Sequence, residues 1–177
     1  RFNDTVRVGV NIAPLHFHRS DFISRLTGIL NQHNLKPESL VLELTERTLM
    51  DEHGTMVQTL TTLKKAGFRL SIDDFGTGYS SLSFIRHLPV TSVKIDKSFV
   101  ADINHSELDA GMAHAIIDMA HYLGLGVVAE GVETEEQLEK LRAWGCNSLQ
   151  GYHICRPGNL ESTLDFIQSW NGFDGKE

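Results

Sequence analysis

The sequence has few of the features that mark secreted, membrane-spanning or nucleic-acid-coating proteins. Its 177 residues include only two cysteines, Cys146 and Cys155, and their spacing fits neither a disulfide framework nor a zinc site. No apolar run approaches the roughly 18–20 residues of a membrane span, and no signal peptide opens the chain. Acidic residues outnumber basic ones by 23 to 16, which argues against a surface that coats nucleic acid polymers. We therefore expect reduced thiols and no membrane contact by this segment.

The composition is that of a globular domain. Hydrophobic residues make up 41% of the chain and charged residues 22%, which argues against disorder. We find no repeat, low-complexity segment or internal linker. The chain opens at Arg1 rather than Met, which indicates a piece of a longer protein.

Short apolar runs alternate with apolar residues at helical spacing. Thr134 and Gln137 form a capping-box pattern, Asn159 is an expected helix cap, and glycines are expected to end helices at Gly67, Gly124 and Gly145. Six strand–helix units in series predict a parallel sheet covered by helices. The strands are expected at residues 7–12, 40–44, 68–72, 93–95, 126–129 and 148–152.

Periodicity alone fits both a barrel and an open doubly wound sheet. Length favours the barrel, because a complete (β/α)₈ barrel needs about 250 residues. Six units in 177 residues match an α/β barrel of the TIM type whose N-terminal strands are missing from this chain.

Polar side chains stand at the C-terminal ends of all six expected strands, where active sites of parallel β/α folds lie. Each one alone is explained by a helix cap or a loop hydrogen bond, above all the two amides. Carboxylates gathered at one rim repel one another and are costly to desolvate, so a cluster indicates bound cations. The residues are Asn11, Glu43, Asp73, Asp74, Lys94, Asp96, Glu130 and Gln150.

The donor set consists of oxygens, with no Cys or His at these positions. Oxygen ligands favour Mg²⁺ or Mn²⁺. The adjacent carboxylates of Asp73 and Asp74 suit two ions, the arrangement that phosphodiester hydrolysis commonly uses. Lys94 is expected to hold a phosphate oxygen or the attacking water; the alternative is a salt bridge to a carboxylate of the same rim.

Two other features carry weaker signals. The glycine-rich stretch at 74–81 lacks the Gly-Lys-Ser/Thr of a phosphate-binding P-loop. We interpret it as a mobile loop that positions the preceding carboxylates, although glycines also serve simple turns. His16 and His18 could bind a metal as a pair, but a surface or packing role is favoured.

Several strings together resemble the EAL phosphodiesterase family. They occur in the family's order along nearly the whole chain, and DDFGTGYSSL (73–82) together with AEGVE (129–133) is very specific. The resemblance implies a modified TIM barrel that hydrolyses cyclic di-GMP to linear pGpG with two Mg²⁺ or Mn²⁺ ions. The strings are VNIA (10–13), ELTE (43–46), DDFGTGYSSL (73–82), VKID (93–96), AEGVE (129–133) and QGY (150–152).

The resemblance also implies roles by position. Glu130 and Lys94 are the expected catalytic residues, Glu130 as general base and Lys94, with Asp96, as a contact to phosphate and metal-bound water. Glu46 resembles the anchor of the loop that holds Gly76, Thr77 and Gly78, and Glu133 a supporting acid of the rim. Metal ligands or their immediate support are implied at Asn11, Glu43, Asp73, Asp74, Glu130 and Gln150.

The Glu-Ala-Leu string that gives the family its name belongs on a strand before Asn11 and is absent. We therefore expect residues 1–172 to be the C-terminal portion of such a domain, with 173–177 as a tail. The resemblance further implies a bacterial, cytoplasmic location, in a whole protein that is either free or membrane-anchored. It also implies a homodimer through the 74–81 loop region and an upstream sensory or GGDEF domain.

Two other functions compete with hydrolysis, a catalytically inactive cyclic-di-GMP receptor and a protein-interaction module. Family members that become receptors usually lose ligands or the loop. Both persist here, which favours the enzyme.

Overall fold

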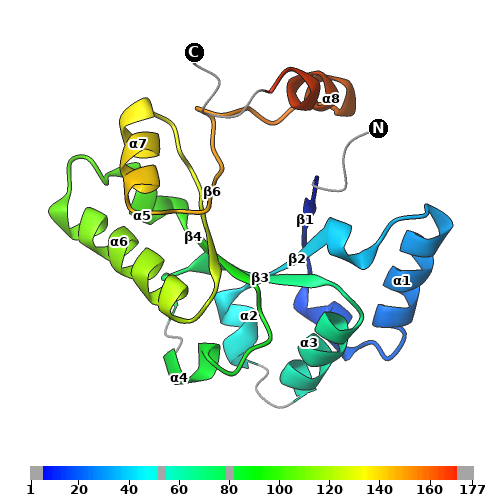
Figure 1. Cartoon of the computed structure of the whole chain (residues 1–177). Helices are drawn as coiled ribbons and strands as arrows, with labels where there is room; N and C mark the ends of the chain where they lie inside the picture. The colour runs from blue at the N-terminus through cyan, green and yellow to red at the C-terminus, as the bar shows by residue number, and fades with distance from the viewer. Residues whose placement is uncertain (1–5, 52–54, 79–81, 171–177) are drawn as a thin grey trace.

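A computed structural model of the chain describes residues 6–51, 55–78 and 82–170. Six strands form one parallel sheet in sequence order, β1-β2-β3-β4-β5-β6. The sheet curls, and the helices that follow its strands cover its outer side (Figure 1). The strands are β1 (Val8–Asn11), β2 (Leu40–Thr45), β3 (Arg69–Phe75), β4 (Ser92–Ile95), β5 (Gly126–Ala129) and β6 (Ser148–Leu149).

The connections contain α-helices of very different lengths and two 3-10 helices. The α-helices are α1 (Phe22–Gln32), α2 (Glu46–Asp51), α3 (Thr55–Lys65), α4 (Leu82–Ile85), α5 (Lys97–Ala101), α6 (Glu107–Tyr122), α7 (Glu135–Ala143) and α8 (Leu160–Ser169). The 3-10 helices are η1 (Pro14–His18) and η2 (Pro37–Ser39). In the part of the chain described, no helix combines the length and apolar character needed to cross a membrane.

The helix signals read from the sequence are confirmed. The Thr134 hydroxyl accepts a hydrogen bond from the Gln137 amide while the Gln137 side chain accepts one from the Thr134 amide, completing the capping box. Asn159 accepts from the Ser162 amide at the start of α8. The three glycines expected at helix ends all have positive φ, namely Gly67, Gly124 and Gly145.

The hydrophobic core lies between the sheet and the outer helices. Alternate strand residues point outward and are at most 1% exposed, because successive side chains of a strand face opposite sides. Leu60 and Leu63 of α3 and Ile117 of α6 meet them from the helix layer, each fully buried. Burying one such side chain contributes roughly 1.5–3 kcal/mol. The strand residues are Leu42, Leu44, Leu70, Ile72, Val93, Ile95, Val127 and Ala129.

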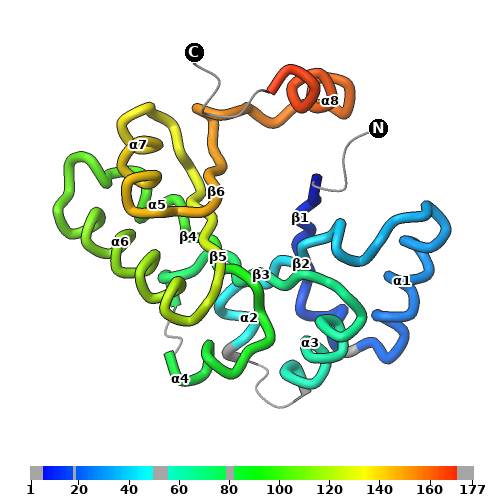
Figure 2. Tube along the Cα trace, viewed as in Figure 1, coloured from blue at the N-terminus to red at the C-terminus, as the bar shows by residue number. Residues whose placement is uncertain are grey.

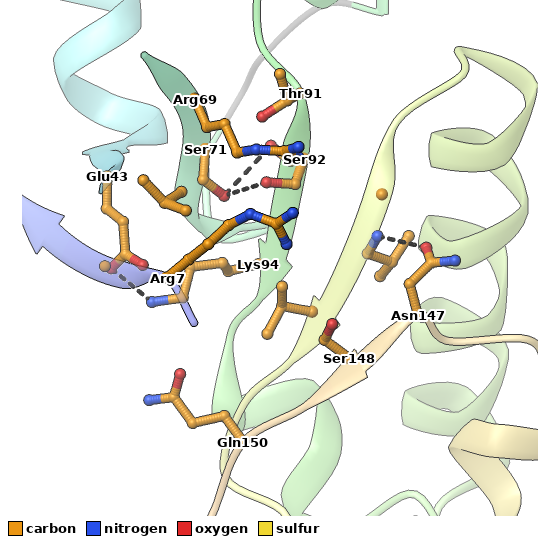
Figure 3. A pocket seen from close by; sticks show the side chains of 15 residues that line it. Arg7, Glu43, Arg69, Ser71, Thr91, Ser92, Lys94, Asn147, Ser148 and Gln150 are labelled. Atoms are coloured by element: carbon orange, nitrogen blue, oxygen red, sulfur yellow. Dashed lines mark hydrogen bonds and ion pairs between the residues drawn. The ribbon is translucent and has the colours of Figure 1, made fainter. Parts of the chain in front are cut away.

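The inner face of the curled sheet is polar. It borders a cavity of about 320 Å³, and Figure 3 shows Arg7, Ser71 and Lys94 around it. TIM-barrel interiors are usually filled by branched apolar side chains. Here the Ser92 hydroxyl donates to Ser71 Oγ at 3.0 Å, and Arg69 Nε is buried without a hydrogen-bond partner among the described residues.

The incomplete TIM-type barrel is confirmed, with differences at the edges of elements. β3 runs on to Phe75, where the sequence predicted a loop after residue 72, and β6 has two residues instead of five. The short helices α2 and α5 were not predicted. Figure 2 traces the chain from β6 to α8, which lies on the same side of the molecule as the first described residues.

Candidate metal centre

An irregularity in β3 brings two neighbouring carboxylates to one side of the sheet. Ile72 of β3 pairs with Val93 of β4, and Phe75 pairs with Ile95. Three steps along β3 therefore match two steps along β4. This extra residue is a β-bulge. Asp74 has the left-handed φ of +53°, and its amide donates to Asp73 Oδ1 at 3.1 Å. In a regular strand these two side chains would face opposite sides.

Three carboxylates from two strands form a compact cluster at the strand ends. Asp73, Asp74 and Glu130 each offer one oxygen, and these oxygens lie within 4.8 Å of one another. Asp73 is buried, while Asp74 and Glu130 are half-buried. A cluster of oxygen ligands with this spacing suits a divalent cation.

Lys94 of β4 ties a fourth carboxylate to this cluster. Its ammonium lies 2.6 Å from Glu130 Oε1, 2.8 Å from Glu43 Oε2 and 3.2 Å from Asp73 Oδ1. The Lys94 side chain is only 8% exposed. Of the two interpretations of Lys94 that the sequence left open, the salt bridge to rim carboxylates is the one observed.

The charges are strongly coupled. Burial works to lower the pKa of Lys94, but the hydrogen bonds to Glu130 and Glu43 outweigh it and raise that pKa. Burial raises the pKa of Glu130, and the charges of Asp73 and Glu43 add to this effect against the pull of Lys94. Burial, with the charges of Asp73 and Asp96, also raises the pKa of Asp74. Three carboxylates therefore share one ammonium, and Asp74 adds a fourth negative charge to the cluster.

Glu46 connects the start of α2 to the glycine-rich loop. It is 3% exposed, and its Oε2 accepts hydrogen bonds from the amides of Gly76 and Gly78 at 3.0 and 3.1 Å. The Thr77 hydroxyl donates to the Asp74 carbonyl at 2.8 Å. These contacts fix the loop directly after the two aspartates. The rest of the stretch, 79–81, lies outside the described residues, and so does that part of the expected dimer contact.

Asn11 is the last residue of β1, and Gln150 directly follows β6. Both are exposed. Asn11 is paired in register with Glu43, and Gln150 lines the inner cavity (Figure 3). Neither is an N-cap, since η1 begins after Ala13 and α8 after Asn159.

Asp96 and Glu133 lie at the outer part of the rim. Asp96 is the N-cap of α5, where its carboxylate accepts from the Ser98 amide at 3.0 Å. Glu133 is exposed and borders a second cavity of about 270 Å³, together with Glu130, Gln150 and Tyr152.

Two groups of residues near the site were missed in the sequence. Lys97 borders the second cavity; its signal was a further lysine directly after the VKID string. Arg7 and Arg69 border the inner cavity. The alternation of side chains along the strands could have found them, because it places both on the same face of the sheet as Glu43. His16 packs its ring against Phe22 with centroids 5.8 Å apart, as the packing interpretation predicted, while the side chain of His18 is outside the described part.

The chain is similar in sequence to known proteins. The family model of the EAL domain matches residues 1–157. The bifunctional diguanylate cyclase/cyclic di-GMP phosphodiesterase MucR of Pseudomonas aeruginosa is 41% identical over 157 residues, 89% of this chain and 23% of that protein. The cyclic di-GMP phosphodiesterase NbdA of the same organism is 42% identical over 168 residues, 95% of this chain and 22% of that protein. The chain thus spans about a quarter of the length of these curated relatives.

Solved structures agree. The MucR phosphodiesterase in complex with c-di-GMP superposes with a TM-score of 0.85 at 41% identity, covering 89% of this chain and 64% of that one. A manganese/cy-diGMP complex of Klebsiella pneumoniae BlrP1 gives a TM-score of 0.80 at 32% identity, covering 85% and 39%. With the family model matching most of its length, the chain belongs to the EAL domain family.

Proposed function

We propose that the chain is part of a phosphodiesterase that hydrolyses cyclic di-GMP to linear pGpG. The observation that carries the proposal is a cluster of four carboxylates at the C-terminal ends of the strands, three of them paired with Lys94 and the fourth, Asp74, beside them. The relatives support it, because two of them are cyclic di-GMP phosphodiesterases by name.

The residues fit divalent cations. All donors are oxygens, and one ammonium leaves three of the four negative charges for cations to balance. We assign Mg²⁺ or Mn²⁺, two ions, to Asn11, Glu43, Asp73, Asp74, Glu130 and Gln150. When bound, such ions supply positive charge to the phosphate and lower the pKa of a bound water.

The remaining roles follow from contacts within the chain. The position of Glu130 in the carboxylate cluster and at the border of the second cavity supports its role as general base. Lys94 and Asp96 would then orient phosphate and water, and Glu133 borders a cavity beside Glu130. Glu46 fixes the backbone at Gly76 and Gly78 and so holds Asp74 in place.

The same proposal covers the setting of the site. Residues 1–172 form the C-terminal portion of the domain and 173–177 its tail, in a bacterial, cytoplasmic segment preceded by a sensory or GGDEF domain. The region around 74–81 forms the homodimer contact.

The test uses the whole protein that contains this chain. Purified protein with Mn²⁺ should convert cyclic di-GMP to pGpG, as followed by chromatography, and excess chelator should abolish the conversion. Glu130→Gln should lower kcat by about 10²–10⁴-fold, the usual contribution of a general acid or base. Glu139→Gln, at an exposed position of α7, is the matched control and should leave kcat unchanged.

Each alternative has its own outcome. Turnover that survives chelation, or a near-normal rate in Glu130→Gln, would contradict the assigned site. Tight nucleotide binding without turnover by the unmodified protein would point to a receptor. Failure to bind the nucleotide at all, with Mn²⁺ supplied, would point to an interaction module.

A further inference from the structure

The ammonium of Lys94 is surrounded by carboxylates of the proposed metal centre. A lysine ammonium has three N–H donors and no acceptor. Three carboxylates surround it, those of Glu43, Asp73 and Glu130, at 2.8, 3.2 and 2.6 Å. The contact with Glu43 is a hydrogen bond and those with Asp73 and Glu130 are ion pairs, so every ion-pair partner of Lys94 among the described residues belongs to the proposed metal centre.

The same three carboxylates belong to the ligand set assigned above to the cations. Asp74 has no ion pair with Lys94 in the described part of the chain, although it shares the cluster with Asp73 and Glu130. A carboxylate oxygen that accepts a hydrogen bond from the ammonium directs a lone pair towards Lys94. A metal ion would need the same lone pair for coordination. The ammonium and a divalent cation therefore compete for the same oxygens.

Lys94 and its partners are largely buried, so few water molecules can reach them. The Lys94 side chain is 8% exposed and that of Asp73 is 11% exposed, so water cannot replace these contacts in full. Removing one partner of a buried ion pair leaves the other uncompensated, at a cost well above that of an exposed pair.

We propose that Lys94 is the internal counter-ion of the metal centre: its ammonium holds the carboxylates together in the metal-free protein, lowers the affinity for divalent cations by competition, and becomes available to substrate only when a cation takes its partners. This inference rests on the proposed function. It makes Lys94 a positioning residue in the metal-free state, distinct from its assigned contact with phosphate or water.

The competition predicts the direction in which cation affinity changes when the ammonium is removed. Without the ammonium, only the weaker effect of exposed cations such as Lys97 offsets the repulsion among the four carboxylates, so the metal-free protein is destabilised and cations bind more tightly. Close charge pairs couple by at least about tenfold in binding constants. A residue that only contacts substrate would leave Mn²⁺ affinity unchanged when it is replaced.

The experiment measures Mn²⁺ binding to the whole protein that contains this chain, by titration calorimetry and by electron paramagnetic resonance of free Mn²⁺, with no substrate present. Lys94→Met should bind Mn²⁺ at least about tenfold more tightly than the wild type and should melt at a lower temperature in chelator. Lys94→Arg keeps the charge and should stay close to wild type. Lys97→Met removes a neighbouring lysine that borders only the outer cavities and should change the affinity less than about threefold, as an exposed charge does.

The outcomes separate this inference from the proposed function. Unchanged or weaker Mn²⁺ binding by Lys94→Met, or an equal gain in Lys97→Met, would overturn the competition while leaving the metal centre in place. Mn²⁺ binding by Lys94→Met, with no detectable binding by the wild type, would be the strongest support for the competition. Absence of binding in every variant, including Lys94→Met folded by circular dichroism, would overturn both.

Discussion

The backbone of Asp74 is in the left-handed region, with φ at +53°. Asparagine tolerates this conformation nearly as well as aspartate, whereas alanine is strained by about 1–2 kcal/mol. Asp74→Asn should therefore fold normally, and in chelator be at least as stable as wild type, because its neutral amide no longer repels Asp73. Its Mn²⁺ affinity should fall by more than about tenfold. Asp74→Ala should lose the same affinity and be less stable than Asp74→Asn by roughly 1 kcal/mol in urea unfolding. Wild-type Mn²⁺ affinity in Asp74→Asn would contradict a ligand role.

Because the pKa of Asp74 is raised, the stability of the metal-free folded protein should depend on pH. The ordinary pKa of Asp74 is 3.8 and the folded value is higher, so between the two values the folded protein binds more protons than the unfolded chain. Stability then falls as pH rises through this window. We expect the metal-free wild type to lose stability relative to Asp74→Asn as pH rises above about 4. Urea unfolding of both proteins in chelator across a pH series checks this; a constant difference would contradict it.

At the scale of elements, the end of β6 packs against the turn after β5. The Val132 amide donates to the Gln150 carbonyl, and the His153 amide donates to the Val132 carbonyl. A Cβ on Gly151 would overlap the backbone O and N of Val132. Gly151→Ala should therefore destabilise the chain by about 1–3 kcal/mol, as overpacking does. Gly111→Ala in α6 is the control, since its Cβ would meet nothing within 4 Å, and it should be neutral or stabilising by up to about 1 kcal/mol. Equal melting temperatures for both variants would show that the contact is unimportant.

Element patterns predicted most of this fold. The six strands came from apolar runs, and α7 and α8 from their caps. The helices α2 and α5 were missed because five or six residues give too little periodicity to detect. The continuation of β3 through Asp73 and Asp74 was missed because adjacent charges suggest a loop, and only pairing with β4 turns them into a bulge.

The site was predictable to the level of the strand ends. Parallel topology places Glu43, Asp73 and Glu130 at one rim, and the sequence is enough for that inference. The convergence of three of these carboxylates on Lys94 depends on strand register and side-chain reach across three strands, which no local pattern encodes. The sequence therefore predicted that these side chains lie at one rim and offered a salt bridge of Lys94 as an alternative, but it did not predict that three carboxylates contact the same ammonium.

For the whole molecule, the excess negative charge at the rim should make stability depend on divalent cations. A ligand at a hundred times its Kd stabilises the folded state by about 2.7 kcal/mol. For a chain of this size the melting temperature should rise by roughly 5–10 °C. Scanning calorimetry with Mn²⁺, against NaCl of equal ionic strength, measures the shift. The NaCl sample should show little change, and an equal rise in both would indicate general screening in place of a specific site.

Every strand of the sheet pairs only with its neighbours in sequence, and this order has a kinetic consequence. The carboxylates come from β2, β3 and the residue after β5, so the centre is complete only when the fifth strand has docked. A cation that recognises the finished cluster arrives after most of the folding barrier has been crossed, so it should slow unfolding without accelerating folding. Stopped-flow measurements with and without Mn²⁺ should show a shared refolding arm and a lowered unfolding arm. Faster refolding with Mn²⁺ would mean that the carboxylates gather early, and that the ion acts as a nucleus for the sheet.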